Sequence, residues 1–170
     1  GTSENLVVNA NGGNDSFSAT GNLAALIKVT VDGSAGDDTI LGTNGADLLI
    51  GGDGNDFIDG NQGNDTALLG AGDDVFQWDP GDGSDIVEGQ AGADTLLFAG
   101  TAWLFADKRL DGAVDTLIID EAGQVSLADA LAMGTAARNV VLLGDPLQLA
   151  QVSQGTHPGG TGASVLEHLL

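Results

Sequence analysis

The stretch GGDGNDFIDGNQGNDTALLGAGDD, residues 51–74, repeats glycine and aspartate at an interval of nine residues and contains no lysine or arginine. When each block of nine is numbered from its first residue, glycine stands at position 4, aspartate at position 6 and an apolar residue at position 8. A flexible glycine-rich linker has no reason to keep an apolar residue in phase. The pattern therefore predicts an ordered repeat.

The same phase continues on both sides of this stretch. Seven blocks keep it: residues 33–41, 42–50, 51–59, 60–68, 69–77, 80–88 and 89–97, with Trp78 and Asp79 inserted once. Their position-6 residues are Asp38, Asp47, Asp56, Asp65, Asp74, Asp85 and Asp94. An earlier, degenerate block, residues 10–18, has Gly13, Asp15 and Phe17 in the corresponding places.

The residue types of a block predict its geometry. Glycines at positions 1, 2 and 4 permit the positive φ of a tight turn. Positions 7 to 9 are prone to form a strand, in which position 8 points inward and positions 7 and 9 point outward. Each block is then half a coil, and equivalent residues of successive coils lie eighteen positions apart.

Stacked coils would bring the position-6 carboxylates close together. Strands in a sheet lie roughly 4.8 Å apart, so one edge would carry Asp38, Asp56 and Asp74, and the other Asp47 and Asp65. Unit charges at this distance repel by about 3 to 4 kcal/mol at an effective dielectric constant of 20. Cations between the turns would remove this repulsion. Carboxylates with main-chain carbonyls form the all-oxygen shell that Ca²⁺ takes, whereas Mg²⁺ demands a smaller octahedral site.

Residues 33–97 resemble the RTX, or hemolysin-type, calcium-binding repeat. Its pattern GGxGxDxUx is met in full by GGDGNDFID at 51–59, and the resemblance is weaker back to about residue 5. It implies a parallel β-roll that folds on binding several Ca²⁺ ions. It also implies a secreted or cell-surface protein exported by type I secretion.

The resemblance also implies a set of metal ligands. These are the position-6 aspartates with the loop residues around them: Gly36, Asp38, Gly45, Asp47, Gly52, Asp53, Gly54, Asp56, Gly63, Asp65, Gly70, Gly72, Asp74, Gly83, Asp85, Gly92 and Asp94. The sequence departs from the family pattern where Leu69 and Pro80 replace the first glycine and where Ala67 underfills the core. With the inserted Trp78 and Asp79, these departures predict weaker or remodelled sites around residues 78–88.

The predicted fold class is all-β, a parallel β-roll over about residues 10–100, followed by a partial α/β segment. We expect three parts. Residues 1–32 form a flank, in which a strand within ATGNLAALIKVTVD, residues 19–32, caps the roll. Residues 33–100 form the calcium-binding roll, and residues 101–170 form the α/β segment.

The nine-residue period stops at residue 97, and the residues that follow show the patterns of separate strands and helices. Strands are predicted over 114–120 and 139–145, with a helix over 126–137 that Ser126 caps, and another helix over 164–170. A strand, a helix and a strand in this order predict one parallel crossover.

LIIDEAGQ at 117–124 and LLGDPLQL at 142–149 resemble motifs II and III of superfamily 1 helicases of the DNA2/Upf1-like branch. The resemblance implies that Asp120 holds Mg²⁺, Glu121 orients the attacking water and Gln148 senses the γ-phosphate. However, the sequence has no GxxxxGK[ST] loop to bind the phosphates. We therefore expect no enzyme activity and no catalytic residue. The two halves resemble unlike proteins, which predicts a chimeric join near residues 99–101, with the second half a fusion or a cap.

The charge composition limits the partners that the chain is expected to bind. The 170 residues carry 25 acidic and 4 basic side chains, a formal charge of −21. We therefore expect calcium ions as partners, and neither nucleic acid nor an anionic membrane surface. The absence of cysteine excludes disulfides and thiolate metal sites, and no apolar run is long enough to span a membrane. Three functions remain open: a calcium-binding roll, an ATP-dependent helicase-like fragment, and the tail of an exported enzyme. The oligomeric state is not determined by the sequence.

Overall fold

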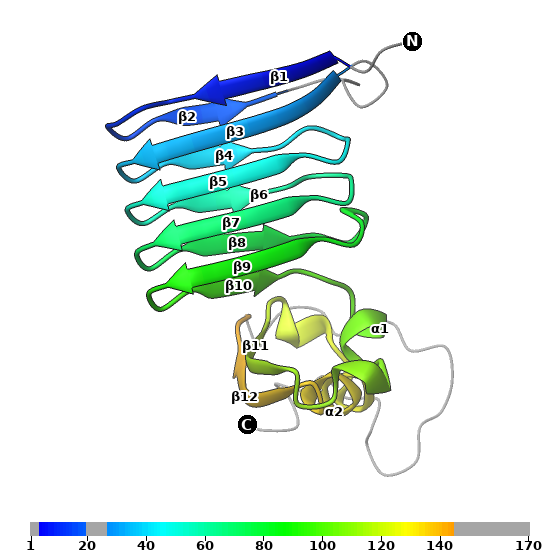
Figure 1. Ribbon diagram of the computed structural model, residues 1–170. Helices are drawn as coiled ribbons and strands as arrows, with labels where there is room; N and C mark the ends of the chain where they lie inside the picture. The colour runs from blue at the N-terminus through cyan, green and yellow to red at the C-terminus, as the bar shows by residue number, and fades with distance from the viewer. Residues whose placement is uncertain (1–3, 20–26, 145–170) are drawn as a thin grey trace. The chain divides into compact units, whose positions relative to one another are not determined.

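The computed structural model describes residues 4–19 and 27–144, and the chain divides into two compact units between Ala99 and Gly100. In the first unit the chain alternates between two five-stranded parallel sheets (Figure 1). The first sheet contains β1 (Glu4–Asn9), β3 (Ile27–Ala35), β5 (Leu48–Asp53), β7 (Thr66–Ala71) and β9 (Ile86–Ala91). The second contains β2 (Ser16–Ser18), β4 (Thr39–Leu41), β6 (Phe57–Asp59), β8 (Val75–Trp78) and β10 (Thr95–Phe98). All strand pairs within these sheets are parallel, the arrangement expected of a β-roll.

The strand register follows the period of the sequence. Thr30 pairs with Leu48 and Leu48 with Thr66, so equivalent residues lie eighteen positions apart, as predicted. The inserted Trp78 and Asp79 lengthen the next offset, and Thr66 pairs with Ile86 twenty positions later. Of the two inserted residues, Trp78 extends β8 and pairs with Phe98, and Asp79 follows the strand, so both sheets continue beyond the insertion.

The predicted inward direction of position 8 is confirmed in the middle of the stack. The buried core of the first unit consists of Val29, Val31, Ile40, Leu49, Ile58, Ala67, Leu69 and Phe76. Leu69, which replaces a position-1 glycine, lies two residues after Ala67 on β7. Because side chains alternate along a strand, Leu69 faces the same core as Ala67 and adds apolar volume beside that small residue.

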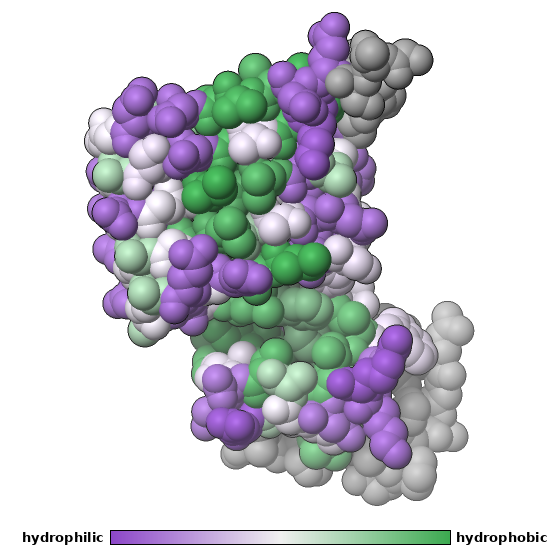
Figure 2. All heavy atoms as spheres, viewed as in Figure 1, coloured by the Kyte–Doolittle hydropathy of each residue, from purple (hydrophilic) through white to green (hydrophobic). Residues whose placement is uncertain are grey.

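Outward positions of the first sheet carry apolar and threonine side chains. The paired row Val7, Thr30, Leu48, Thr66 and Ile86 crosses this sheet at position 7. An apolar band flanked by polar side chains is visible over this face in Figure 2. Both ends of the row are open to solvent, with Val7 68% and Ile86 59% exposed.

The prediction of a capping strand within residues 19–32 is wrong for the part that the structure describes. Strand β3 pairs with β1 on one side and with β5 on the other, so it lies inside the sheet. The edge strand is β1, which pairs with β3 at an offset of twenty-three, since Glu4 lies opposite Ile27. Residues 20–26 lie outside the described residues. The parallel sheets therefore begin at Glu4, earlier than the predicted start near residue 10.

The second unit contains a two-stranded parallel sheet of β11 (Val114–Ile119) and β12 (Ala137–Leu142). Helix α1 (Ala102–Phe105) precedes it, and α2 (Leu127–Gly134) lies between the strands in sequence. The Ser126 hydroxyl accepts a hydrogen bond from the amide of Asp129 and caps α2, as predicted. Short 3-10 helices occupy Lys108–Leu110 and Ala122–Gln124. No helix in residues 4–19 and 27–144 is long and apolar enough to cross a membrane. The helix predicted over 164–170 falls outside these ranges.

Candidate metal-binding site

The position-6 aspartates form two columns, one at each edge of the stack. The first column contains Asp15, Asp38, Asp56, Asp74 and Asp94, and the second contains Asp47, Asp65 and Asp85. In both, the main-chain amide of one aspartate donates to Oδ1 of the aspartate one coil later. The distance is 2.8 Å from Asp38 to Asp56 and 2.9 Å from Asp65 to Asp85. Each carboxylate thus holds the turn of the preceding coil, a contact that the sequence interpretation missed.

The second carboxylate oxygen has a different environment. Oδ2 of Asp38, Asp56, Asp65, Asp74 and Asp85 is buried and has no hydrogen-bond partner among the described residues. Asp56 and Asp65 are only 2% and 1% exposed. A buried charged oxygen without a partner is strongly unfavourable unless a cation or proton neutralises it. The same orphaned atom recurs in successive coils, so the chemistry that it requires recurs too.

The glycine at position 1 leaves space for this oxygen. A Cβ on Gly33, Gly51 or Gly60 would overlap Oδ2 of the aspartate five residues later in the same block. None of these three glycines has a positive φ. The prediction that position 1 needs a left-handed backbone is therefore wrong: small size is needed there. Leu69 and Pro80 are the exceptions, in the blocks before and after the inserted residues.

Position 4 requires glycine for two reasons: its backbone is left-handed, and there is no room for a Cβ. Gly36, Gly54 and Gly72 have positive φ values of 126°, 133° and 144°. A Cβ on Gly54 would overlap the carbonyl oxygen of Gly36, one coil earlier, and a Cβ on Gly72 would overlap that of Gly54. Backbones of neighbouring turns therefore touch at this position. The contact brings main-chain carbonyl oxygens to the same edge of the stack as the carboxylate column.

Two further sets of hydrogen bonds join neighbouring turns. The amide of Gly36 donates to the carbonyl of Asp53, at 2.7 Å, and that of Gly54 donates to the carbonyl of Ala71, at 2.8 Å. At position 5 the side chains of Asn14, Asp37, Asn55 and Asp73 accept from amides one coil later, at 2.8 to 3.0 Å. Amide and carboxylate side chains alternate along this exposed row, which keeps its negative charges two coils apart.

Burial dominates the electrostatics of the columns. It raises the pKa of Asp65 to about 7, against the lowering effect of the hydrogen bond from Asp47, and repulsion from Asp47 and Asp85 adds to the rise. Burial likewise raises the pKa of Asp56 and of Asp74. These carboxylates resist ionisation in the stack as it stands, which is the behaviour expected of groups that need a counter-ion.

The inserted residues remodel the turn that follows β8. The amide of Asp79 donates to Oδ2 of Asp82 at 2.5 Å, and the amide of Gly63 donates to the carbonyl of Asp82 at 2.5 Å. Asp82 is 8% exposed, and burial raises its pKa, with repulsion from Asp59 adding to the rise. The sequence interpretation named no role for Asp82. The available signal was its place at position 3 of the interrupted block.

The predicted ligand Asp53 is not in either column. Its side chain is exposed at the end of β5, and its carbonyl oxygen is occupied by the amide of Gly36. Among residues 4–19 and 27–144 there is no cluster of three or more Asp, Glu, His or Cys side chains suited to a metal. A cation at the columns would therefore depend on main-chain carbonyls as well as on carboxylates.

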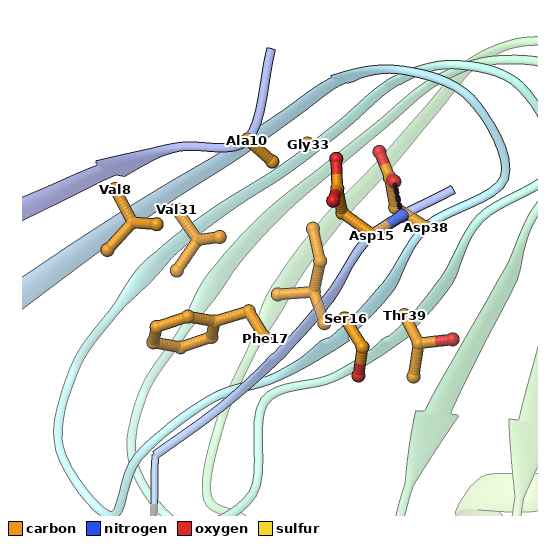
Figure 3. A pocket seen from close by; sticks show the side chains of 10 residues that line it. Val8, Ala10, Asp15, Ser16, Phe17, Val31, Gly33, Asp38 and Thr39 are labelled. Atoms are coloured by element: carbon orange, nitrogen blue, oxygen red, sulfur yellow. Dashed lines mark hydrogen bonds between the residues drawn. The ribbon is translucent and has the colours of Figure 1, made fainter. Parts of the chain in front are cut away.

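A pocket of about 120 Å³ lies at the first end of the first column. Apolar side chains of Val8, Val31 and Phe17 line one part of it, and Asp15 and Asp38 line another. Figure 3 shows the two carboxylates side by side, with the Asp15 amide hydrogen-bonded to Asp38. The pocket thus lies between the first carboxylate column and side chains that pack against the core.

The acidic pair of the second unit lies directly after β11. Glu121 has a left-handed backbone with φ of 53°, and its amide donates to Oδ1 of Asp120 at 2.8 Å. Oε2 of Glu121 accepts from Nε2 of Gln124 at 3.3 Å, and the Ala122 amide donates to the Leu143 carbonyl at 2.8 Å. The strand ends of β11 and β12 are thereby joined. Gln148, the predicted phosphate sensor, lies outside the described residues.

Comparison with known proteins agrees with both resemblances. Residues 32–67 and 41–76 match the model of the RTX calcium-binding nonapeptide repeat, four copies. Residues 81–161 match a model described as an AAA domain, a helicase-like region; this match begins before the predicted join near residues 99–101. No curated protein and no solved structure matches the chain. Residues 32–76 therefore match RTX calcium-binding nonapeptide repeats, and residues 81–161 are similar to an AAA domain.

Proposed function

We propose that the first unit is a calcium-binding module that takes up several Ca²⁺ ions along its two carboxylate columns and folds as it binds them. The observation that supports this most directly is the recurring buried Oδ2 atom of Asp38, Asp56, Asp65, Asp74 and Asp85, which has no partner among the described residues. A hard divalent cation that prefers oxygen ligands is the partner that such atoms lack.

The residues that would hold the ions are the position-6 aspartates together with carbonyl oxygens of the neighbouring turns. The bound ion supplies positive charge that offsets carboxylate repulsion. The chain's own contribution is to present one oxygen per aspartate while the other is fixed by an amide, as in the 2.8 Å bond from Asp56 to Asp74. Ligands fixed in this way lose little freedom when the ion binds. Asp53 is not proposed as a side-chain ligand, because it is exposed.

Folding coupled to calcium follows from the same atoms. The unfolded chain can solvate its carboxylates, whereas the stack buries them, so stability depends on neutralising the buried charge. Such a module suits the calcium-rich exterior of the cell, and we propose a secreted or cell-surface location with type I export. This proposal draws on the resemblance to RTX repeats.

Circular dichroism during a calcium titration tests the proposal. The expected result is a coil-to-strand transition with Ca²⁺ and a much smaller change with the same concentration of Mg²⁺. Isothermal titration calorimetry on the same samples counts the ions. A spectrum that is already that of a folded β protein without calcium, combined with no heat of binding, would overturn the proposal.

A second candidate function belongs to the helicase-like region. The observation in its favour is the acidic pair Asp120 and Glu121, joined by a 2.8 Å hydrogen bond at a strand end. Such a pair at the end of a parallel strand is placed as in nucleotide-binding α/β proteins. The 170 residues contain no phosphate-binding GxxxxGK[ST] loop, so we propose no ATP hydrolysis by this chain. Differential scanning fluorimetry with Mg-ATP, scored on the second unit, tests for residual nucleotide binding.

A further inference from the structure

The turn of residues 42–47 joins β4 to β5 (Figure 1) and differs in backbone conformation from the other turns of the stack. In the six other blocks of the repeat, the residues at positions 2 and 4 both have a positive φ. The position-2 residues of those blocks are Ser34, Gly52, Asn61, Gly70, Gly81 and Gln90. Thr43 and Gly45, at positions 2 and 4 of the block 42–50, do not have a positive φ.

The side chain of Thr43 accounts for this difference. Thr43 is the one residue branched at Cβ among the position-2 residues of the seven blocks. A positive φ is an outlier for such a residue, whereas glycine adopts it readily and unbranched residues adopt it occasionally. The backbone therefore follows another path through this turn, and Gly45 does not take up the left-handed conformation of the other position-4 glycines.

Hydrogen bonds within the block close the turn. The amide of Thr43 donates to Oδ2 of Asp47 at 2.7 Å. The amide of Gly45 donates to the hydroxyl oxygen of Thr43 at 3.1 Å. In four of the other blocks the position-4 amide donates instead to a carbonyl one coil later. The block 42–50 thus uses its own amides to satisfy its own side chains.

Asp65 shows the contrasting arrangement one coil later, in the turn that joins β6 to β7. Its Oδ1 accepts from the amide of Asp47 at 2.8 Å, and its Oδ2 is buried with no partner among the described residues. A Cβ on Gly60 would overlap this oxygen, whereas a Cβ on Gly42 would stand 3.2 Å from Oδ2 of Asp47. Thr43 and Asp47 are only 2% and 4% exposed, so their hydrogen bond is shielded from water.

We infer that Thr43 excludes calcium from the turn 42–47, and that Asp47 is not among the ligands. This inference rests on the proposed calcium binding along the columns and restricts it. At Asp65 the buried Oδ2 lacks a partner, whereas at Asp47 an amide of the same turn supplies a short hydrogen bond to the charged oxygen. A cation could take that oxygen only by breaking this bond. The turn therefore forms without an ion, and the second column offers ion sites from Asp65 onward.

Counting the bound ions tests the inference. Native mass spectrometry of the full chain in excess calcium gives the number of ions per chain, and circular dichroism verifies that each variant is folded. Thr43→Gly should bind one ion more than the wild type, because glycine adopts the left-handed backbone readily. Thr43→Val is the matched control. It loses the hydroxyl but keeps the branched Cβ, so its ion count should equal that of the wild type.

The reverse exchange is possible one coil later. Asn61 occupies position 2 of the block 60–68 with a φ of 58°. Asn61→Thr should bind one ion fewer, because a branched Cβ disfavours this backbone. Asn61→Ser should keep the count, since Ser34 has a φ of 76° at the same position. Both variants lose the 2.9 Å hydrogen bond from the Asn61 side chain to the carbonyl of Gly42, so the branched Cβ is what distinguishes them.

A folded Thr43→Gly chain with an unchanged ion count overturns the inference. A gain of an ion in Thr43→Val overturns it too, because the branched Cβ would then not be the cause of exclusion. If Thr43→Gly does not fold, the pair at position 61 decides, and equal counts in Asn61→Thr and Asn61→Ser contradict the inference. A wild-type chain that binds calcium while these variants leave its ion count unchanged contradicts only the role of Thr43. A wild-type chain that binds no calcium contradicts the proposed function as well.

Discussion

The amide of Asp38 donates to Oδ1 of Asp56, 2.8 Å away and eighteen residues later, while Oδ2 of Asp56 is buried without a partner among the described residues. One carboxylate thus has two separable tasks. Oδ1 accepts the hydrogen bond from the amide of the preceding turn, a task for which any acceptor atom at this place would suffice. Oδ2 requires a positive charge, and this division allows the two tasks to be tested by different substitutions.

Asp56→Asn should weaken calcium binding while it preserves the stack. The side-chain carbonyl of Asn can still accept from the Asp38 amide, but the negative charge is lost. Asp56→Ala removes both the hydrogen-bond acceptor and the negative charge. It leaves the buried amide of Asp38 unpaired, which lowers the free energy of unfolding by a further amount of about 1 to 3 kcal/mol. Calorimetric titration with calcium measures the first effect, and urea unfolding in saturating calcium measures the second.

Two further variants serve as controls for the substitutions Asp56→Asn and Asp56→Ala. Asp94 lies in the last coil, where fewer turns surround it. Asp94→Asn should therefore weaken calcium binding less than Asp56→Asn does. Asp53→Asn should leave affinity nearly unchanged, since that side chain is exposed. Equal losses at all three positions would contradict a column of sites centred in the stack.

Gly54→Ala should destabilise the first unit by about 2 to 4 kcal/mol. Its φ of 133° is unfavourable for any residue with a Cβ, and that Cβ would overlap the Gly36 carbonyl oxygen. Gly134→Ala on α2 is the control, because its Cβ would meet nothing closer than 3.9 Å. It should be neutral or slightly stabilising, as expected of alanine in a helix. Chemical denaturation followed by circular dichroism measures both.

Calcium should abolish the fall in stability that the calcium-free first unit shows as pH rises. Burial raises the pKa of Asp65 to about 7, above its usual value near 4 in unfolded chains. Between these two values the calcium-free folded state binds more protons than the unfolded state, so its free energy of unfolding falls as pH rises from about 4 to 7. With calcium bound the ligands must be deprotonated, so the folded state binds fewer protons than the unfolded state only around and below pH 4. The stability of the calcium-bound state is therefore lost as pH falls through that range and is nearly level from about 5 to 7.

Thermal unfolding at several pH values, in calcium and in a chelator, measures both slopes. Asp65→Asn should flatten the calcium-free slope, because the group that takes up the proton is gone. Two parallel slopes, with and without calcium, would contradict the exchange of proton for metal at the columns.

Phe98→Leu should loosen the last coil. The rings of Trp78 and Phe98 stack with centroids 4.5 Å apart and an interplanar angle of 10°. Loss of this stacking costs about 1 kcal/mol beyond the change in buried area. Unfolding followed by tryptophan fluorescence reports on it, because the other tryptophan, Trp103, is 88% exposed and changes little. Leu97→Met, on the exposed outer face, should leave the midpoint unchanged.

Much of the first unit could be predicted from the sequence because one period controls both pairing and burial. The eighteen-residue register follows from it, as does the inward direction of Ile40, Leu49, Ile58 and Phe76. The edge strand β1 could not be predicted in the same way. It lies before the regular blocks and pairs at an offset of twenty-three, which the period does not specify.

The site was predictable in its residue types but not in its contacts. Spacing alone places Asp38, Asp56 and Asp74 at one edge, but it does not reveal that each carboxylate divides its oxygens between an amide and a buried space. The need for a small residue at Gly51 depends on where Asp56 directs Oδ2. Asp53 shares the acidic character of the column residues, and only the strand geometry shows that its side chain lies outside the columns.

The bonds between neighbouring turns also determine how the molecule would respond to tension. The Asp38 amide is held by the following coil, and the Asn55 amide by the preceding one, so two neighbouring turns can separate only when both bonds break. Pulled from its ends in an optical trap, the first unit would give way one coil at a time. Each rupture would release eighteen residues, or roughly 60 Å of extended chain, and the coil that contains the insertion would release slightly more.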